Sequence, residues 1–227
     1  MKRIILVAVM FATVFSLSAQ EADSKNSYMM SDLSLGANTD IFVGALSFQR
    51  LHTVVNDKLH LGYGLRLNYH QASDQNYITA PFEFTAEEKI DTLRMSTINT
   101  LSLSANIHLA FSVTPKLLVG FNIDAIGLSF GAEQDANIRY LYSDPSAADV
   151  LTKAKPTSAN VLLVGDNDIG TLNSEFYVRY KVGGNLYLRP GFSFFFSEYT
   201  TTIAGSDDNN RFRNKIGYPF LAVSYRI

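Results

Sequence analysis

The sequence contains no cysteine, and this absence excludes two classes of exported protein. A domain held together by disulfides is excluded, and so is a lipoprotein anchored through an N-terminal cysteine. After the first twenty residues the chain also lacks any apolar run long enough for a transmembrane helix. An excess of positive charge is missing as well, because 19 basic residues face 21 acidic ones. A surface that follows nucleic-acid phosphates needs excess Lys and Arg, so nucleic acid is excluded as a partner.

The first twenty residues have the composition of a secretory signal peptide. Lys2 and Arg3 precede an almost continuously apolar stretch at 4–17, and small residues stand just before Gln20. The stretch is about fourteen residues long, whereas a spanning helix needs roughly twenty. We therefore predict a signal peptide at 1–19, cleaved after Ser18 or Ala19, and an exported domain at 20–227. Loss of the two basic residues leaves 17 against 21 acidic ones, a net charge of −4.

Most of the exported part alternates apolar and polar residues with a period of two. In 59–70 every odd position is Leu or Tyr, and the even positions are His, Gly, Arg or Asn. The same alternation recurs at 101–112, 117–125, 172–182, 186–197 and 221–227. This period marks a strand with one apolar and one polar face. Several of these strands are about twelve residues long, which at a tilt near 45° matches the hydrocarbon thickness of a bilayer.

The connections between the strands alternate between short and long. Short turns are expected at 53–58, 114–116 and 182–185, and longer polar loops at 71–95, 132–170 and 200–212. The predicted strands are 213–227, 185–199, 171–182, 116–130, 96–113, 58–70, 41–53 and a short first strand at 31–36. The predicted fold is therefore all-β. It is a closed antiparallel up-and-down transmembrane β-barrel of eight strands, with short periplasmic turns and longer extracellular loops.

The alternation is interrupted once, near Gly127. Apolar residues up to Ala125 occupy odd positions, whereas Leu128 and Phe130 are even. A β-bulge near Gly127 would return both side chains to the lipid face. Without a bulge they would point inward and fill the upper lumen.

The last strand carries the resemblance to a known family. The chain ends on Leu221, Val223, Tyr225 and Ile227 with shorter or polar residues between them. This resembles the C-terminal signal that the outer-membrane assembly machinery recognises, although the commonest last residue of that signal is phenylalanine. With the export signal and the strand pattern, the chain resembles small outer-membrane barrels of the OmpA/OmpX/OmpW kind. Residues 120–124 and 163–175 also resemble in sequence uncharacterised barrels of Bacteroidetes-type bacteria. The resemblance implies an architecture and no activity.

The inward faces of the predicted strands carry a set of polar and charged side chains. An eight-stranded barrel is narrow enough for side chains to fill it, and unpaired buried charges cost several kcal/mol each. We therefore predict an ion-paired lumen network; the alternative is a gated narrow pore in which these pairs rearrange. The predicted members are Arg66, His108, Asp124, Glu175, Arg179 and Arg189.

Three further groups of residues invite a chemical interpretation. His70, Ser73 and Asp74 are the residue types of lipid A acyl-chain enzymes, but they are equally ordinary loop-edge residues. Residues 165–170 have carboxylates two positions apart, as in calcium loops, yet the pattern lacks a third ligand and suits a turn. The tyrosines near strand ends are predicted to join an interfacial aromatic girdle, and the loop pair fits either the girdle or a binding surface. The strand-end residues are Tyr69, Tyr199 and Tyr218, and the loop pair is Tyr140 and Tyr142.

These patterns together predict an integral outer-membrane barrel with a filled lumen and without enzymatic activity, cofactor or metal. Its role would be structural, or binding of an unidentified extracellular ligand through the loops at 71–95 and 132–170. The expected partners are outer-membrane lipid, lipopolysaccharide and the assembly machinery. Three alternatives stay open: a narrow gated pore for small solutes, a lipid A-modifying enzyme, and a soluble exported β-protein that binds a ligand.

Overall fold

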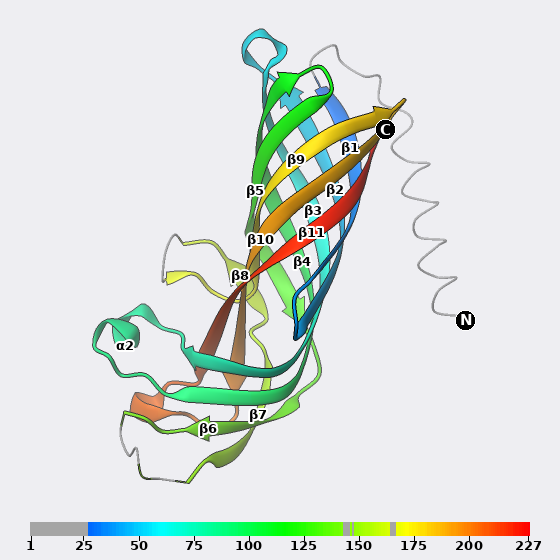
Figure 1. Cartoon of the computed structure of the whole chain (residues 1–227). Helices are drawn as coiled ribbons and strands as arrows, with labels where there is room; N and C mark the ends of the chain where they lie inside the picture. Colours follow the sequence, from blue (N-terminus) through cyan, green and yellow to red (C-terminus); the bar gives the residue numbers. More distant parts are fainter. Residues whose placement is uncertain (1–26, 143–145, 147, 164–166) are drawn as a thin grey trace.

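A computed structural model describes residues 27–227, apart from 143–145, 147 and 164–166 (Figure 1). The predicted signal peptide at 1–19 and its cleavage site lie outside the described residues. Among the described residues, no helix is both long and apolar enough to cross a membrane.

Eight antiparallel strands form a closed ring (Figure 1). Each strand pairs with the next one around the barrel, and the last strand closes the ring on the first through pairs from Met30–Arg226 to Gly36–Phe220. The predicted eight-stranded barrel is therefore confirmed, including its first strand. In order around the ring the strands are β1 (Ser27–Ala37), β2 (Ile41–Thr53), β3 (Leu59–Thr79), β4 (Thr92–Thr114), β5 (Leu117–Phe130), β9 (Leu172–Gly183), β10 (Leu186–Thr201) and β11 (Arg211–Arg226).

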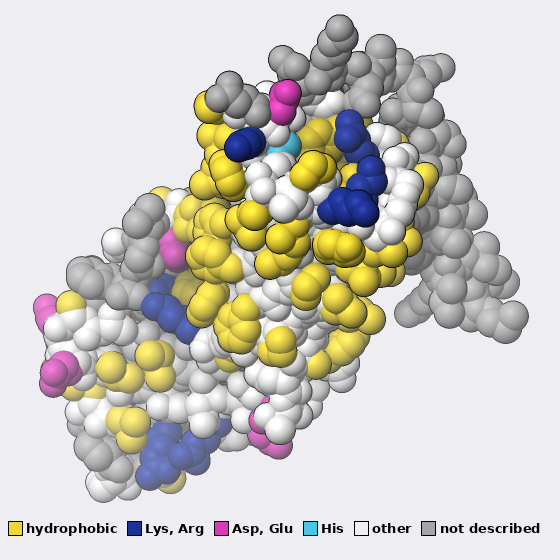
Figure 2. Space-filling model, turned by 45° about the horizontal axis from the view of Figure 1, so that its top comes forward, with side chains coloured by type: hydrophobic (Ala, Val, Ile, Leu, Met, Phe, Trp, Pro, Cys, Tyr) yellow, Lys and Arg dark blue, Asp and Glu magenta, His cyan; other side chains and the backbone are white. Residues whose placement is uncertain are grey.

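The outer wall of this ring is apolar and its interior is polar. Leu65 is 56% exposed on the outside, while its neighbour Arg66 is 1% exposed inside. Apolar side chains cover the barrel wall, and several Lys and Arg side chains lie at one end of it (Figure 2). A closed barrel with such an exterior satisfies its backbone hydrogen bonds internally, which is what a strand needs to cross a bilayer.

A bulge is present in β5, close to Gly127. Ala105 pairs with Ile126 and Asn106 with Asp124, so Ala125 is the additional residue on the β5 side. Leu128 and Phe130 are consequently 52% and 53% exposed on the outer wall. Of the two alternatives that the sequence leaves open, the structure has the one with a bulge.

The short turns at 53–58, 114–116 and 182–185 and both ends of the described chain lie at the same end of the barrel (Figure 1). One of these turns contains the short helix η1 (Val55–Asp57). Outer-membrane barrels have short turns on the periplasmic side and longer connections outside. We use this rule to name the two ends periplasmic and extracellular.

The connections at 71–95, 132–170 and 200–212 are long, as predicted, but the prediction of loop throughout is wrong, because part of each range is strand. β3, β4, β10 and β11 continue beyond the apolar wall, and β6 (Gln134–Arg139) and β7 (Val150–Pro156) join them. These strands pair in the order β3–β4–β6–β7–β10–β11, and β11 returns to β3 through Phe212–Thr79 and Arg213–Ile78. They form a second closed ring, which we call the cap barrel. The remaining short elements at this end are α2 (Phe82–Ala86), β8 (Ala159–Val161), which pairs with β5, and η3 (Ser206–Asp208).

The cap barrel has an apolar core. This is the reverse of the arrangement in the eight-stranded ring, which we call the membrane ring. Tyr77, Leu93, Ile138, Tyr199 and Phe212 are all fully buried inside it. The change of face occurs where the two rings meet. Ser73 pairs with Thr97 and Gln75 with Met95, so one residue on each strand is left without a pairing partner there. A strand that leaves lipid for water must turn its apolar side chains inward, and this irregularity allows it to do so.

Candidate functional site

All six predicted lumen residues face the interior of the membrane ring. Arg66, His108, Asp124 and Arg189 are 1% exposed, Arg179 is 2% and Glu175 is 3%. The alternation along the strands is sufficient to place these six side chains inside, because each one lies between lipid-facing neighbours.

Five of the six join a chain of alternating charges. From the extracellular side, Asp124 Oδ1 lies 3.5 Å from Arg66 Nη1, and Arg66 Nη2 lies 3.3 Å from Glu175 Oε2. The same carboxylate oxygen accepts a 2.7 Å hydrogen bond from Arg189 Nη1. Asn122 Nδ2 also donates to it at 2.8 Å, and Asn122 accepts a hydrogen bond from Arg66 through its side-chain oxygen. Side chains from four strands therefore meet at Glu175, namely from β3, β5, β9 and β10.

Asp32 on β1 completes this chain and is absent from the predicted network. Its Oδ2 lies 3.1 Å from Arg189 Nε and 3.0 Å from Arg179 Nη2, and Gln49 Nε2 donates to the same atom at 2.5 Å. The network thus contains three arginines and three carboxylates. The alternation in the first strand could have identified Asp32, because it places Asp32 on the inward face next to the lipid-facing Leu33.

His108 is the predicted member that forms no ion pair in the network. Its Nε2 lies 2.8 Å from Asn106 Oδ1 on the same strand. The structure therefore brings five of the six residues into one ion-paired chain and places the sixth beside it.

Aromatic rings pack against this network and fill the lumen further. The Arg189 guanidinium lies 4.9 Å from the ring centres of both Tyr177 and Phe220, and the Arg179 guanidinium lies 5.3 Å from Tyr177. Towards the cap barrel, the rings of Phe195 and His70 are 4.7 Å apart. Side chains therefore occupy the lumen from the ion pairs to the apolar core of the cap barrel. This arrangement can hold charges in a fixed structure.

The three candidate residues for lipid A chemistry are not brought together. His70 is 1% exposed and faces the lumen, whereas Ser73 and Asp74 are exposed. No hydrogen bond joins any two of these three described residues. The reason is the strand period, which sends His70 and Ser73 to opposite faces of β3.

The candidate calcium run at 165–170 lies partly outside the described residues. Within the described part, Asp168 Oδ1 accepts a 2.8 Å hydrogen bond from the Leu163 backbone, which is a turn contact. Among the described residues, no group of three His, Asp or Glu side chains is arranged to hold a metal ion.

The tyrosines divide differently from the prediction. Tyr69 is 42% exposed on the outer wall and donates to Asn99 Oδ1 at 3.1 Å, which suits a girdle position. Tyr199 is wrong as a girdle residue, because it is fully buried in the cap barrel 2.7 Å from the Thr100 hydroxyl. Tyr218 also faces inward at 2% exposure. In the loop pair, Tyr140 is half-buried and donates to the Ala204 carbonyl at 2.8 Å, while Tyr142 is exposed.

The predicted assembly signal lies on the strand that closes the barrel. Leu221, Val223 and Tyr225 are 54%, 48% and 45% exposed on the outer wall. The Ile227 backbone donates to the Met29 carbonyl at 3.0 Å, which fixes the end of the chain beside β1. Recognition of these residues by the assembly machinery stays a prediction.

Comparison with known proteins gives similar solved structures only. No family model and no curated protein matches the sequence. The chain is similar to Neisserial surface protein A at 12% identity, with a TM-score of 0.39 over 88% of this chain and 97% of that one. It is similar to a major outer membrane protein from Thermus thermophilus at 10% identity, with a TM-score of 0.42 over 88% and 99%. It is also similar to the Yersinia pestis outer membrane protein Ail at 9% identity, with a TM-score of 0.36 over 90% and 100%. The solved structures similar to this chain thus include small outer-membrane barrels, the kind of protein that the sequence resembles.

Proposed function

We propose that this chain is a sealed, non-enzymatic outer-membrane barrel that presents the cap barrel to molecules outside the cell. The observation that carries the proposal is the continuity of β3, β4, β10 and β11. These strands run from a lumen filled by ion pairs directly into a second ring with its own apolar core. A rigid scaffold that holds exposed loops is a common arrangement for binding.

A buried carboxylate fixes the loops of the cap barrel. Asp91 is 1% exposed, and its Oδ1 accepts hydrogen bonds from the backbones of Leu141 and Tyr142 at 2.9 and 3.3 Å. Its Oδ2 accepts a 2.7 Å hydrogen bond from the backbone of Ser206. Three connections that are far apart in the sequence are therefore tied to one side chain, which supports a preorganised binding surface.

What we call the loop surface consists of Leu141, Tyr142 and Ile203, which are exposed on the connections tied to Asp91, and of the half-buried Lys89. The three apolar side chains are between 42% and 46% exposed, and Lys89 Nζ lies 5.8 Å from the Tyr142 ring centre. Hydrogen bonds to Glu87 and Asp207 raise the pKa of Lys89 above its ordinary value and hold the amine in place. Exposed aromatic and apolar groups resemble the core composition of protein-binding surfaces.

Binding is tested with the purified protein in nanodiscs on an array of immobilised polysaccharides and proteins. We expect at least one component to bind, and the double variant Leu141→Ser, Tyr142→Ser to lose that binding. Leu163→Ser is the matched control, because Leu163 is 50% exposed and lies outside the loop surface. Undiminished binding by the double variant, or no binding by the unaltered protein, would reject a role of the loop surface.

The seal is tested separately by conductance across planar bilayers. We expect no events above leak, because the ion pairs around Glu175 and the aromatic rings fill the lumen. Conductance steps that Glu175→Gln alters would instead support the gated pore.

A further inference from the structure

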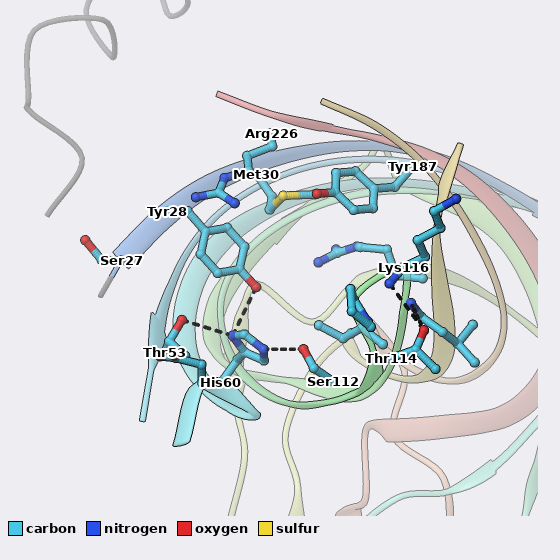
Figure 3. A pocket seen from close by; sticks show the side chains of 15 residues that line it. Ser27, Tyr28, Met30, Thr53, His60, Ser112, Thr114, Lys116, Tyr187 and Arg226 are labelled. Carbon is cyan, nitrogen blue, oxygen red and sulfur yellow. Dashed lines mark hydrogen bonds between the residues drawn. The ribbon is translucent and has the colours of Figure 1, made fainter. Parts of the chain in front are cut away.

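The periplasmic end of the barrel contains a pocket of about 320 Å³ that the proposed function does not use (Figure 3). Its walls come from all eight strands of the ring and from the short turns, so it lies inside the ring of strands. The side chains used in the argument are Tyr28, His60, Ser112, Lys116, Arg179 and Arg226.

The pocket has an excess of positive charge. Arg179, Lys116 and Arg226 line it, and Asp57 is the acidic residue among its described lining residues. The Lys116 amine forms no ion pair with any described residue, and the Arg226 guanidinium lies 4.6 Å from the Tyr28 ring centre. Basic side chains converging on one small volume attract an anion.

Arg179 has donors without acceptors in this pocket. Its side chain is 2% exposed, and its Nη2 is occupied by both carboxylate oxygens of Asp32 at 3.3 and 3.0 Å. Its Nε and Nη1 are buried and have no hydrogen-bond acceptor among the described residues. Buried guanidinium donors without acceptors are costly, so this position favours a ligand that supplies oxygen atoms.

A hydrogen-bond network holds the opposite wall in place. His60 Nδ1 lies 3.2 Å from the Tyr28 hydroxyl and 3.3 Å from the Thr53 hydroxyl, and His60 Nε2 lies 2.7 Å from Ser112 Oγ (Figure 3). The network links β1, β2, β3 and β4 across the mouth. The pocket is therefore a preformed polar site and not a gap between mobile turns.

We propose that this pocket binds the carboxylate or phosphate group of a small water-soluble molecule from the periplasm. Arg179 supplies the buried charged donors, and Lys116 and Arg226 supply charge at the opening. A lipid headgroup is disfavoured because the strands that surround the pocket separate it from the outer wall of the barrel. This site is at the opposite end from the loop surface and shares no residue with it, although Arg179 belongs to both the pocket and the lumen network.

The test is isothermal titration calorimetry of the full exported protein in a non-ionic detergent. Inorganic phosphate and glutarate are titrated separately. We expect saturable binding of at least one probe, weakened by added salt. Lys116→Gln should weaken it about tenfold, since a hydrogen bond to a charged group is lost. Arg179→Lys keeps the charge but removes the buried Nε and Nη1 donors, and we expect it to abolish binding. The probe that binds more tightly identifies the ligand as a phosphate or a carboxylate.

Lys153→Gln is the matched control, because Lys153 pairs with Asp135 on the cap barrel at the other end of the molecule. It should bind the probe like the unaltered protein. Heat-modifiable migration on gels verifies that each variant is folded. Absence of saturable binding, or equal binding by Lys116→Gln and Lys153→Gln, would overturn the proposal. So would competition by phosphatidylglycerol in nanodiscs, since it would assign the pocket to a lipid headgroup.

Discussion

Asp32 carries the negative charge at the periplasmic end of the lumen network, where it contacts Arg179 and Arg189. The variant Asp32→Asn would leave both guanidinium groups without this shared acceptor charge. We expect the free energy of unfolding in detergent micelles to fall by about 3–5 kcal/mol, because removing one partner leaves buried charges uncompensated. Urea titration followed by circular dichroism measures this change.

Asp40 provides the control at the same scale, because it is an exposed carboxylate in the turn after β1. Asp40→Asn should change the free energy of unfolding by no more than about 0.5 kcal/mol. Equal effects of the two variants would show that the lumen network does not stabilise the barrel.

The difference between Arg66 and Asp32 shows what the sequence can predict about single residues. The period of two places Arg66 inside the barrel without knowledge of any partner. It cannot show which side chain of another strand lies opposite across the lumen. Asp32 meets Arg179, which is 147 positions away, only because β11 closes the ring on β1. Contacts of this kind depend on closure and register, which local patterns do not contain.

At the scale of the strand, β3 and β4 change the face that they bury where the membrane ring meets the cap barrel. Asp74 lies at this point with a φ of 50°, in the left-handed region that Asp tolerates and β-branched residues do not. We expect Asp74→Val to destabilise the β3–β4 hairpin by about 1–2 kcal/mol. The measurement is the rate of tryptic cleavage at Lys89 and Arg94, which should rise.

Ser73→Val tests whether the effect comes from the backbone conformation. Ser73 is the exposed neighbour of Asp74 and has a negative φ, so valine fits its extended backbone. Its cleavage rate should stay that of the unaltered protein. Faster cleavage of both variants would mean that added apolar surface, and not strain at Asp74, loosens the hairpin.

The same change of face explains why the cap strands were predicted as loops. Beyond Tyr69 the outward positions become Gln71 and Ser73, while buried residues such as Tyr77 appear on the other face. The alternation of apolar lipid-facing residues therefore ends after Tyr69, although the strand continues. Tyr199 was misplaced in the girdle for the same reason. The strands inside the membrane were predictable because one rule of polarity holds along all of them.

At the scale of the whole molecule, the two rings bury different kinds of side chain. The membrane ring packs ion pairs inside and apolar residues outside, whereas the cap barrel packs Tyr77, Leu93 and Phe212 inside. Each ring closes through its own strand pairs, with β11 on β1 in one and β11 on β3 in the other. The rings are therefore expected to behave as two units of stability.

Replacing residues 75–95 by an Asn-Gly turn separates these units. The pairs between β3 and β4 from Leu59–Phe111 to Ser73–Thr97 remain, as does the lumen network. We expect the shortened protein to assemble in the outer membrane and to keep heat-modifiable migration. β6 loses its partner β4 and the core residues Tyr77 and Leu93, so tryptic cleavage at Lys153 on β7 should become faster. Failure of the membrane ring to assemble would show instead that the two rings fold as one cooperative unit, since no lipid-facing residue and no lumen charge is removed.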